Sequence, residues 1–439
     1  MTGGKPGPAA LLVLHGRTLS FRADPATAGE VRSHVYRERG AVAIGADGRI
    51  AWAGDRRSLP AALRAWPSLD FGRKLILPGF VDAHLHFPQY RMIAAYGRDL
   101  LDWLKRYTFP EEMRYADPRL AAKAARAFLD ELVHHGITAC LAFSTVHPQA
   151  LDALFGEAKR RRMAVISGKT LMDINAPAGL RDTAARAYRE TKALIGRWSG
   201  RGRLRYAISP RFAVTSSEAQ LEATGALARE HPGLIVQTHL SENRGEIEFV
   251  AKAFPQSKDY TDVYDRHGLL GPRSFFAHGI HLLDRELARL AESGSSIVHC
   301  PTSNNFLGSG QFRWRKSREA GVRVGVGCDI GGGTSFSMFA TLRDAYQVSQ
   351  LCGARISAFD AFYAATLGNA RLLGLDEEAG SLEAGKFADL VVLDSRATPI
   401  MAARDDLNAS LHDLLFQLMI MGDDRAVAAT FIAGRKVKG

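Results

Sequence analysis

The sequence predicts an α/β protein: a (β/α)8 TIM-like barrel with a small composite β-sandwich domain built from both termini. Residues 79–382 alternate short apolar runs with Ala- and Leu-rich stretches at helical spacing. Both ends of the chain consist instead of short apolar runs separated by turn residues. We therefore predict a barrel at 79–382 and a composite domain of 1–78 with 383–439; a doubly wound sheet is the alternative for the middle section.

Eight short apolar runs in the middle section are the expected barrel strands, and three stretches at helical spacing are the clearest helices between them. The runs cover residues 79–87, 137–143, 164–170, 204–209, 234–239, 274–278, 296–299 and 322–326. The helices are expected at 120–133, 151–163 and 285–293. Eight strand-and-helix units over this length are typical of a closed barrel.

The two ends of the chain carry the strands of the composite domain. We expect strands at 11–14, 41–44 and 50–53 near the start, and at 389–394 and 428–434 near the end. Asp47-Gly48 falls between two of these runs, and this dipeptide is typical of a hairpin turn.

Composition excludes several classes of protein. The 439 residues are 46% hydrophobic and 23% charged, as in soluble globular proteins, and no apolar run approaches the ~18 residues of a membrane span. No signal peptide is recognisable, and the four cysteines are far apart, so we expect a cytoplasmic protein with reduced thiols. The net charge of +11 is spread along the chain without interleaved aromatic residues, so we expect neither nucleic acid nor membrane as a partner.

Four histidines and an aspartate predict a metal site. His84 and His86 stand two apart at the end of the first barrel strand and therefore point to the same side. His239, His278 and Asp329 stand at the ends of the fifth, sixth and eighth strands. Since a barrel builds its site at the C-terminal ends of its strands, these side chains are expected to meet around one metal ion.

The residues alone leave the number of ligands open. A catalytic zinc usually takes three protein ligands and a water, so one of the five candidates could hold the water instead. A second metal would need a bridging ligand, which Ser209-Pro210-Arg211 at the end of the fourth strand does not offer. Lys169, on the third strand, is interpreted as structural.

Two histidines and two cysteines lie near these residues in the sequence. His281 and His299 either orient the metal ligands or simply pack. Cys300 and Cys328 are expected to alternate away from the site, into the core.

Glu242 follows His239 by three residues. A carboxylate desolvated beside a cation can accept and return a proton, which predicts general acid–base chemistry. The alternative is a surface glutamate that starts a helix, where the helix dipole favours it.

These residues resemble the amidohydrolase superfamily. The resemblance covers nearly the whole chain, from 77–86 at the front to 380–392 at the back. Within the superfamily the chain is similar to the branch that deaminates guanine. The segments that carry this closer similarity are 103–111, 209–212, 239–243, 260–265 and 329–335.

The resemblance implies a set of roles for residues of this chain. One zinc ion per chain would be held through His84, His86, His239, His278 and Asp329, although the sequence does not separate zinc from iron. Guanine would be bound by Gln89, Arg211, Phe212, Glu242 and Asp329, and the protein would be a homodimer. A guanidinium suits the O6 and N7 edge of guanine, and an aromatic ring suits its flat face.

The implied reaction is the hydrolysis of guanine to xanthine and ammonia. Asp329 would take a proton from zinc-bound water, the hydroxide would attack C2, and Glu242 would protonate N3 and help the amino group leave. The enzyme alternative is a sister aminohydrolase acting on 8-oxoguanine, an adenosine derivative or a triazine. A metal-free structural relative and a nucleic-acid-binding protein are the alternatives from other classes.

Overall fold

The computed structural model describes residues 11–439, so the first ten residues of the predicted composite domain lie outside it. The strands are β1 (Leu12–Phe21), β2 (His34–Ile44), β3 (Ile50–Asp55), β4 (Ser68–Pro78), β5 (Phe80–His86), β6 (Ile137–Phe143), β7 (Ala164–Gly168), β8 (Thr170–Leu171), β9 (Leu204–Pro210), β10 (Ile235–Leu240), β11 (Ser274–His278), β12 (Ser296–His299), β13 (Arg323–Val326), β14 (Leu390–Leu393), β15 (Val427–Ile432) and β16 (Arg435–Lys438).

Helices occupy most of the connections between these strands. They are α1 (Pro25–Ala28), α2 (Glu30–Ser33), α3 (Leu100–Trp103), α4 (Phe109–Met113), α5 (Pro118–His134), α6 (Pro148–Arg161), α7 (Ala184–Trp198), α8 (Glu218–Glu230), α9 (Arg244–Ala253), α10 (Tyr260–Arg266), α11 (Asp284–Glu292), α12 (Pro301–Phe306), α13 (Trp314–Glu319), α14 (Met338–Leu351), α15 (Ala358–Tyr363), α16 (Asn369–Leu373), α17 (Pro399–Asp405) and α18 (Leu411–Met421). None of the helices within residues 11–439 combines the length and apolar content that crossing a membrane requires.

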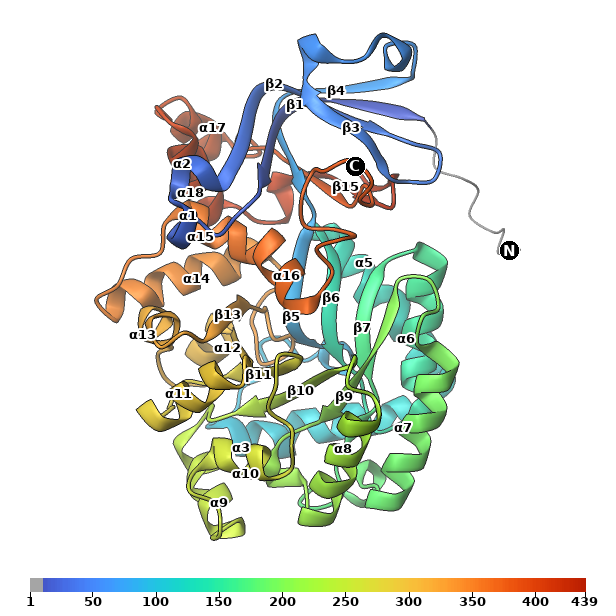
Figure 1. Cartoon of the computed structure of the whole chain (residues 1–439), viewed down its shortest axis with the longest axis vertical. Coiled ribbons are helices and arrows are strands. Elements are labelled where there is room, and N and C mark those ends of the chain that lie inside the picture. The colour runs from blue at the N-terminus through green and yellow to red at the C-terminus, as the bar shows by residue number, and fades with distance from the viewer. Residues whose placement is uncertain (1–10) are drawn as a thin grey trace.

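The barrel predicted for the middle section is confirmed. Its parallel strands follow the order β5-β6-β7-β9-β10-β11-β12-β13, with the short β8 beside β9 (Figure 1). The loop after β13 returns to β5, because Asp329 donates its N–H to the carbonyl of His84 at 2.9 Å. Nearly every residue of these strands is buried, since helices cover the outside and side chains fill the inside.

The three clearest helix predictions correspond to α5, α6 and α11, which begin one to three residues earlier than expected. Pro118 and Pro148 stand at the first turns of α5 and α6, where proline costs no hydrogen bond. Asp117 caps α5 by accepting the N–H of Arg119 at 2.8 Å. The apolar spacing predicted all three helices, whereas the start of α5 is set by its proline and its cap, and that of α6 by its proline.

The second sheet combines both ends of the chain in the order β16-β15-β14-β4-β1-β2-β3. Its two halves share one apolar cluster, in which Ile44 and Ile50 of the first half pack with Leu390 and Phe431 of the second. The predicted hairpin joins β2 to β3, and Gly48 supplies the positive φ of 83° that the turn needs.

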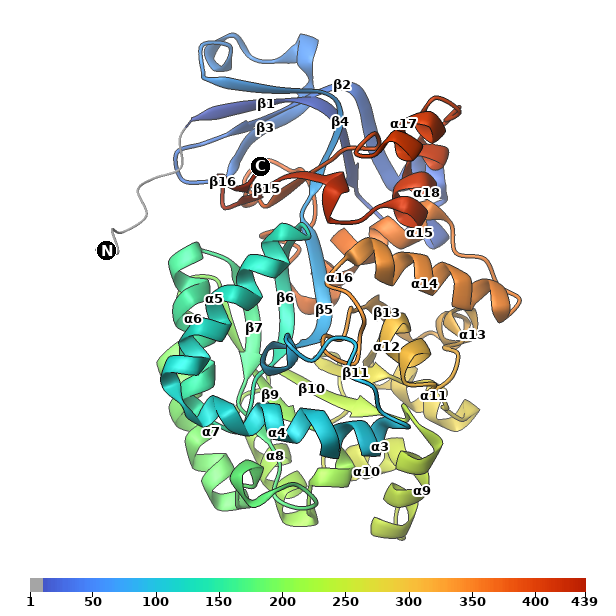
Figure 2. The ribbon, with the colours of Figure 1, turned by 180° about the vertical axis from the view of Figure 1, so that it is seen from behind.

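One part of the C-terminal section differs from its interpretation as short strands. Between β14 and β15 the chain forms α17 and α18, and α18 packs on α14 beside the barrel (Figure 2). We keep the boundaries 1–78 plus 383–439 and 79–382 as a proposal. Gly79 alone separates β4 of the terminal sheet from β5 of the barrel.

A buried ion pair joins the barrel to the terminal sheet. Arg203, just before β9, donates to Asp389 just before β14 at 3.0 Å, and their side chains are 6% and 1% exposed. We expect Arg203→Ala to lower the free energy of unfolding by about 3–5 kcal/mol, because Asp389 would be left buried and unpaired. Urea denaturation measures this. The control is Arg197→Ala, an exposed arginine paired with the half-buried Asp152; equal losses in both variants would contradict the prediction.

Candidate metal centre and pocket

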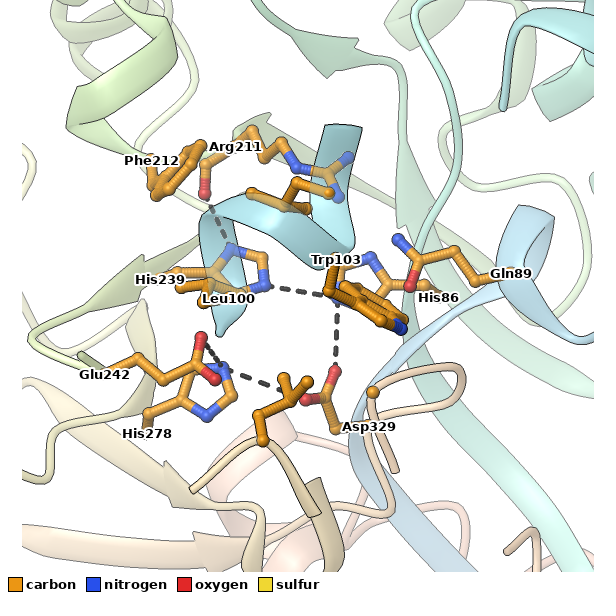
Figure 3. A pocket seen from close by; sticks show the side chains of 13 residues that line it. His86, Gln89, Leu100, Trp103, Arg211, Phe212, His239, Glu242, His278 and Asp329 are labelled. Atoms are coloured by element: carbon orange, nitrogen blue, oxygen red, sulfur yellow. Dashed lines mark hydrogen bonds and ion pairs between the residues drawn. The ribbon is translucent and has the colours of Figure 1, made fainter. Parts of the chain in front are cut away.

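The five predicted metal ligands meet at the C-terminal end of the barrel strands, and Figure 3 shows all of them except His84. The Nε2 atoms of His84 and His86 each lie 3.2 Å from Oδ1 of Asp329. His86 Nε2 is 3.1 Å from His239 Nε2, and His278 Nε2 is 3.8 Å from the other oxygen of Asp329. Since β5 runs away from the terminal sheet, the cluster lies at the far end of the barrel (Figure 1).

Two of these residues adopt unusual backbone conformations. His278 has a φ of 72° and Asp329 a φ of 52°, in the left-handed region that non-glycine residues rarely adopt. Such strain is typical of functional sites. The loop that carries Asp329 also needs Gly333, because a Cβ there would come within 1.7 Å of the carbonyl oxygen of Cys328.

The histidines present lone pairs to a common centre. His239 Nδ1 lies 2.7 Å from the carbonyl oxygen of Arg211, which only accepts, so this nitrogen carries the hydrogen and Nε2 is free to bind. His278 Nδ1 lies 2.8 Å from Oδ1 of Asn304, which orients its Nε2 in the same way. These are the outer contacts that histidine ligands of metals usually make.

The charges of the cluster suit a cation. Burial lowers the pKa of His86 to about 3 and that of His239 well below its usual value, so both imidazoles are neutral. Burial alone would raise the pKa of Asp329, but the adjacent imidazoles of His84 and His86 hold it well below its usual range. Neutral imidazoles around an ionised carboxylate are a donor set that fits zinc or a similar divalent metal.

Glu242 lies beside this cluster and is 3% exposed. Its Oε2 is 3.3 Å from His278 Nε2, and its Oε1 accepts from the hydroxyl of Ser309 at 3.2 Å. Burial raises the pKa of Glu242 to about 8, and the charge of Asp329 contributes. Its backbone is held by Glu246, which accepts the N–H of Glu242 at 2.9 Å. A surface glutamate at a helix start does not describe this residue.

The five predicted substrate contacts, Gln89, Arg211, Phe212, Glu242 and Asp329, all line one pocket, together with His86 (Figure 3). Arg211 is 3% exposed and Gln89 1% exposed. The structure adds Glu112, a fully buried carboxylate of α4 that binds both Arg211 and Gln89. The sequence analysis missed Glu112; two glutamates after a proline are typical of any helix start.

One wall of the pocket is apolar, and the sequence did not predict the residues that form it. Leu100, Trp103 and Leu104 line it, from α3 and the helical turn that follows. The indole N–H of Trp103 has no hydrogen-bond partner among residues 11–439. Trp103 and Leu104 lie in a segment that carried the resemblance, but no spacing rule connected them to the histidines.

The structure shows which groups His281, His299 and Lys169 contact. His281 Nε2 lies 2.7 Å from the carbonyl oxygen of Ser309, so it supports the loop whose hydroxyl contacts Glu242. His299 packs on Phe312, with ring centroids 4.6 Å apart. Lys169 is buried in an ion pair with Asp182, which agrees with a structural role.

Cys300 lies in the core, as expected, but the prediction that it faces away from the site is wrong. It was expected to face away, but its sulfur lies within 4.8 Å of a ring nitrogen of His278 and a carboxylate oxygen of Asp329. Alternation fails because β12 ends at His299, one residue earlier. Burial raises the pKa of the Cys300 thiol well above its usual value, so it remains a neutral thiol. Cys328 is buried as expected.

Comparisons with known proteins agree with the site. Residues 75–437 match the amidohydrolase family. A relative from Escherichia coli (strain K12) named guanine deaminase is 47% identical over 394 residues, which cover 89% of each chain. A solved structure of the E. coli guanine deaminase matches with a TM-score of 0.93 at 44% identity, covering 97% of this chain and 99% of that one. A guanine deaminase structure from C. acetobutylicum, with guanine bound in its active site, matches with a TM-score of 0.87 at 29% identity, covering 97% and 99%.

Proposed function

The chain belongs to the amidohydrolase family, and from this premise we propose that it hydrolyses guanine to xanthine and ammonia. The observation that carries the proposal is one pocket in which a metal-ligand set, a buried glutamate and an arginine come together. The relatives and solved structures named guanine deaminase support it.

The proposed cofactor is one zinc ion per chain, held by His84, His86, His239, His278 and Asp329. When bound, it supplies Lewis acidity and lowers the pKa of water toward 7. Support comes from the neutral imidazoles and the ionised carboxylate described above. The grouping of all five side chains also argues against the metal-free alternative.

The protein's own groups are proposed to bind the base and move its protons. Arg211 donates to the O6 and N7 edge of guanine, Gln89 lies beside it, and Phe212 packs on the flat face of the base. Asp329, kept ionised by its histidine neighbours, accepts the proton of the attacking water. Glu242, whose pKa burial raises to about 8, holds a proton that it delivers to N3 of the ring.

The test of the function is incubation of the purified protein with guanine, followed by measurement of xanthine and ammonia. Adenosine, 8-oxoguanine and a triazine are the comparison substrates for the sister aminohydrolase alternative. Faster release of ammonia from any of these than from guanine would favour that alternative.

We also propose that the protein is a cytoplasmic homodimer. The cytoplasmic location is supported by the four separated cysteines, which are unpaired in the structure. The homodimer is supported by the resemblance alone. Size-exclusion chromatography with light scattering measures the mass of the assembly, and a monomer at micromolar concentration would contradict it.

Arg211 provides a prediction for substrate binding. Arg211→Lys keeps a positive charge for Glu112 but loses the planar pair of donors, so kcat/KM for guanine should fall by roughly 10–100-fold with little loss of stability. The control is Arg244→Lys, on the exposed first turn of α9. Steady-state kinetics with guanine checks this; an unchanged kcat/KM would remove Arg211 from the pocket.

A further inference from the structure

We propose that Glu112 is a positioning residue that makes the pocket selective for a purine with an oxygen at C6. The inference rests on the proposed function, since it concerns how guanine is distinguished from related bases. Glu112 acts through Arg211 and Gln89, and we assign it no contact with the reacting atoms.

Glu112 is the shared partner of the two proposed substrate contacts. Its Oε1 accepts from Gln89 Nε2 at 2.8 Å and from Arg211 Nη1 at 2.8 Å. Its Oε2 accepts from the same Nη1 at 2.9 Å. The side chains of Arg211 and Glu112 are 4% and 0% exposed, so each compensates a charge that water does not reach.

These contacts determine which atoms Gln89 presents. A carboxylate only accepts hydrogen bonds, so the atom of Gln89 that meets Glu112 must be the amide nitrogen. The backbone N–H of Gly331 only donates, and it lies 3.2 Å from Oε1 of Gln89. The orientation of the amide is therefore set from both sides.

The same contacts determine which N–H groups of Arg211 remain for a ligand. Its hydrogen bonds to side chains within residues 11–439 all go from Nη1 to Glu112, so the N–H groups of Nε and Nη2 remain for a ligand. The backbone of Arg211 is also held, because its carbonyl accepts from His239 Nδ1 at 2.7 Å. Glu112 thus holds one edge of a planar donor group whose other edge is free.

The N–H groups of Arg211 and Gln89 all donate hydrogen bonds, so they favour an oxygen at C6 of the bound purine. The O6 atom of guanine accepts hydrogen bonds, whereas the amino group of 2,6-diaminopurine would place N–H against N–H. Buried donors left without an acceptor are costly, and this cost is what separates the two bases. If Glu112 were an amide, its NH2 could face the N–H groups of Arg211 and Gln89 and let both side chains turn.

The experiment compares guanine with 2,6-diaminopurine, which carries the same amino group at C2. In Glu112→Gln we expect the ratio of kcat/KM values, guanine over 2,6-diaminopurine, to fall at least ~10-fold, mainly through a higher KM for guanine. Zinc content should equal that of the wild type, since Glu112 contacts no proposed ligand side chain.

The matched control is Glu111→Gln, the neighbouring carboxylate on α4. Glu111 pairs with Arg91 at 3.1 Å and Arg114 at 2.7 Å, and its removal should leave the ratio unchanged. Glu112→Asp keeps the charge but is one methylene shorter. Glu112→Asp is the variant to test if Glu112→Gln does not fold. We expect it to raise the KM for guanine while kcat stays within about 3-fold of the wild-type value.

The outcomes separate the inference from the proposed function. Wild-type protein that forms no xanthine would contradict the function itself. Wild-type activity together with an unchanged ratio in Glu112→Gln, or an unchanged KM in Glu112→Asp, would overturn the role of Glu112. A fall in kcat alone, with the ratio unchanged, would also overturn it, because positioning for selectivity predicts a loss that depends on the base.

Discussion

Replacing Glu242 with glutamine is expected to reduce xanthine formation by at least ~10²–10⁴-fold while the protein still folds, holds zinc and binds guanine. The amide is nearly isosteric with the carboxyl group but cannot take and return a proton. Glu242 is buried beside His278 and Ser309, so its loss as an acid should not be replaced by bulk water.

Zinc content, melting temperature and xanthine formation should be measured on one preparation of this variant. The matched control is Glu248→Gln, an exposed carboxylate further along α9, which should keep normal activity. Near-normal turnover in Glu242→Gln would reject the proton-transfer role. Loss of zinc would instead make Glu242 a metal ligand.

Removal of the metal is expected to abolish turnover, and one equivalent of zinc per chain should restore it. The melting temperature should fall in the metal-free protein, because a metal that binds the native state stabilises it. The physical reason is that the imidazoles around Asp329 bring their donor atoms within 4.8 Å of one another, close enough to hold one ion. Elemental analysis, thermal unfolding and guanine turnover before and after chelation measure these effects.

Replacing one proposed metal-binding residue tests the need for the metal at this site in particular. His239→Ala should lose both zinc and activity, whereas His134→Ala, at an exposed histidine paired with Asp424, should keep both. Two tightly held metals per chain in the wild type would contradict the mononuclear site, and full activity of the chelated protein would contradict a metal role altogether.

Local patterns in the sequence were enough to predict the barrel strands and the histidines and aspartate that gather at their C-terminal ends. The two-residue spacing of His84 and His86 placed both on one side of β5, and both reach the same oxygen of Asp329. Strand alternation and the rule that barrel sites form at strand ends are properties of the backbone, so they hold wherever the strand itself persists.

The same rules failed where the strands had ended. Cys300 stands one residue beyond β12, so alternation no longer described its direction. The position of Asp329 after β13 correctly predicted that it joins the cluster, but no residue pattern indicated its positive φ, three residues beyond the strand. Beyond a strand, the direction of a side chain depends on how its loop packs.

Periodic patterns and positions at strand ends were therefore sufficient to predict the barrel, the terminal sheet in outline, and the meeting of the four histidines with Asp329 and Glu242. The contacts of Glu112 with Arg211 and Gln89, and that of Ser309 with Glu242, became known only from the tertiary structure. Arg211 is 99 residues from Glu112, and Ser309 is 67 from Glu242. Contacts between loops at that separation follow no local period, since they exist only after the closed barrel has brought the ends of different strands together.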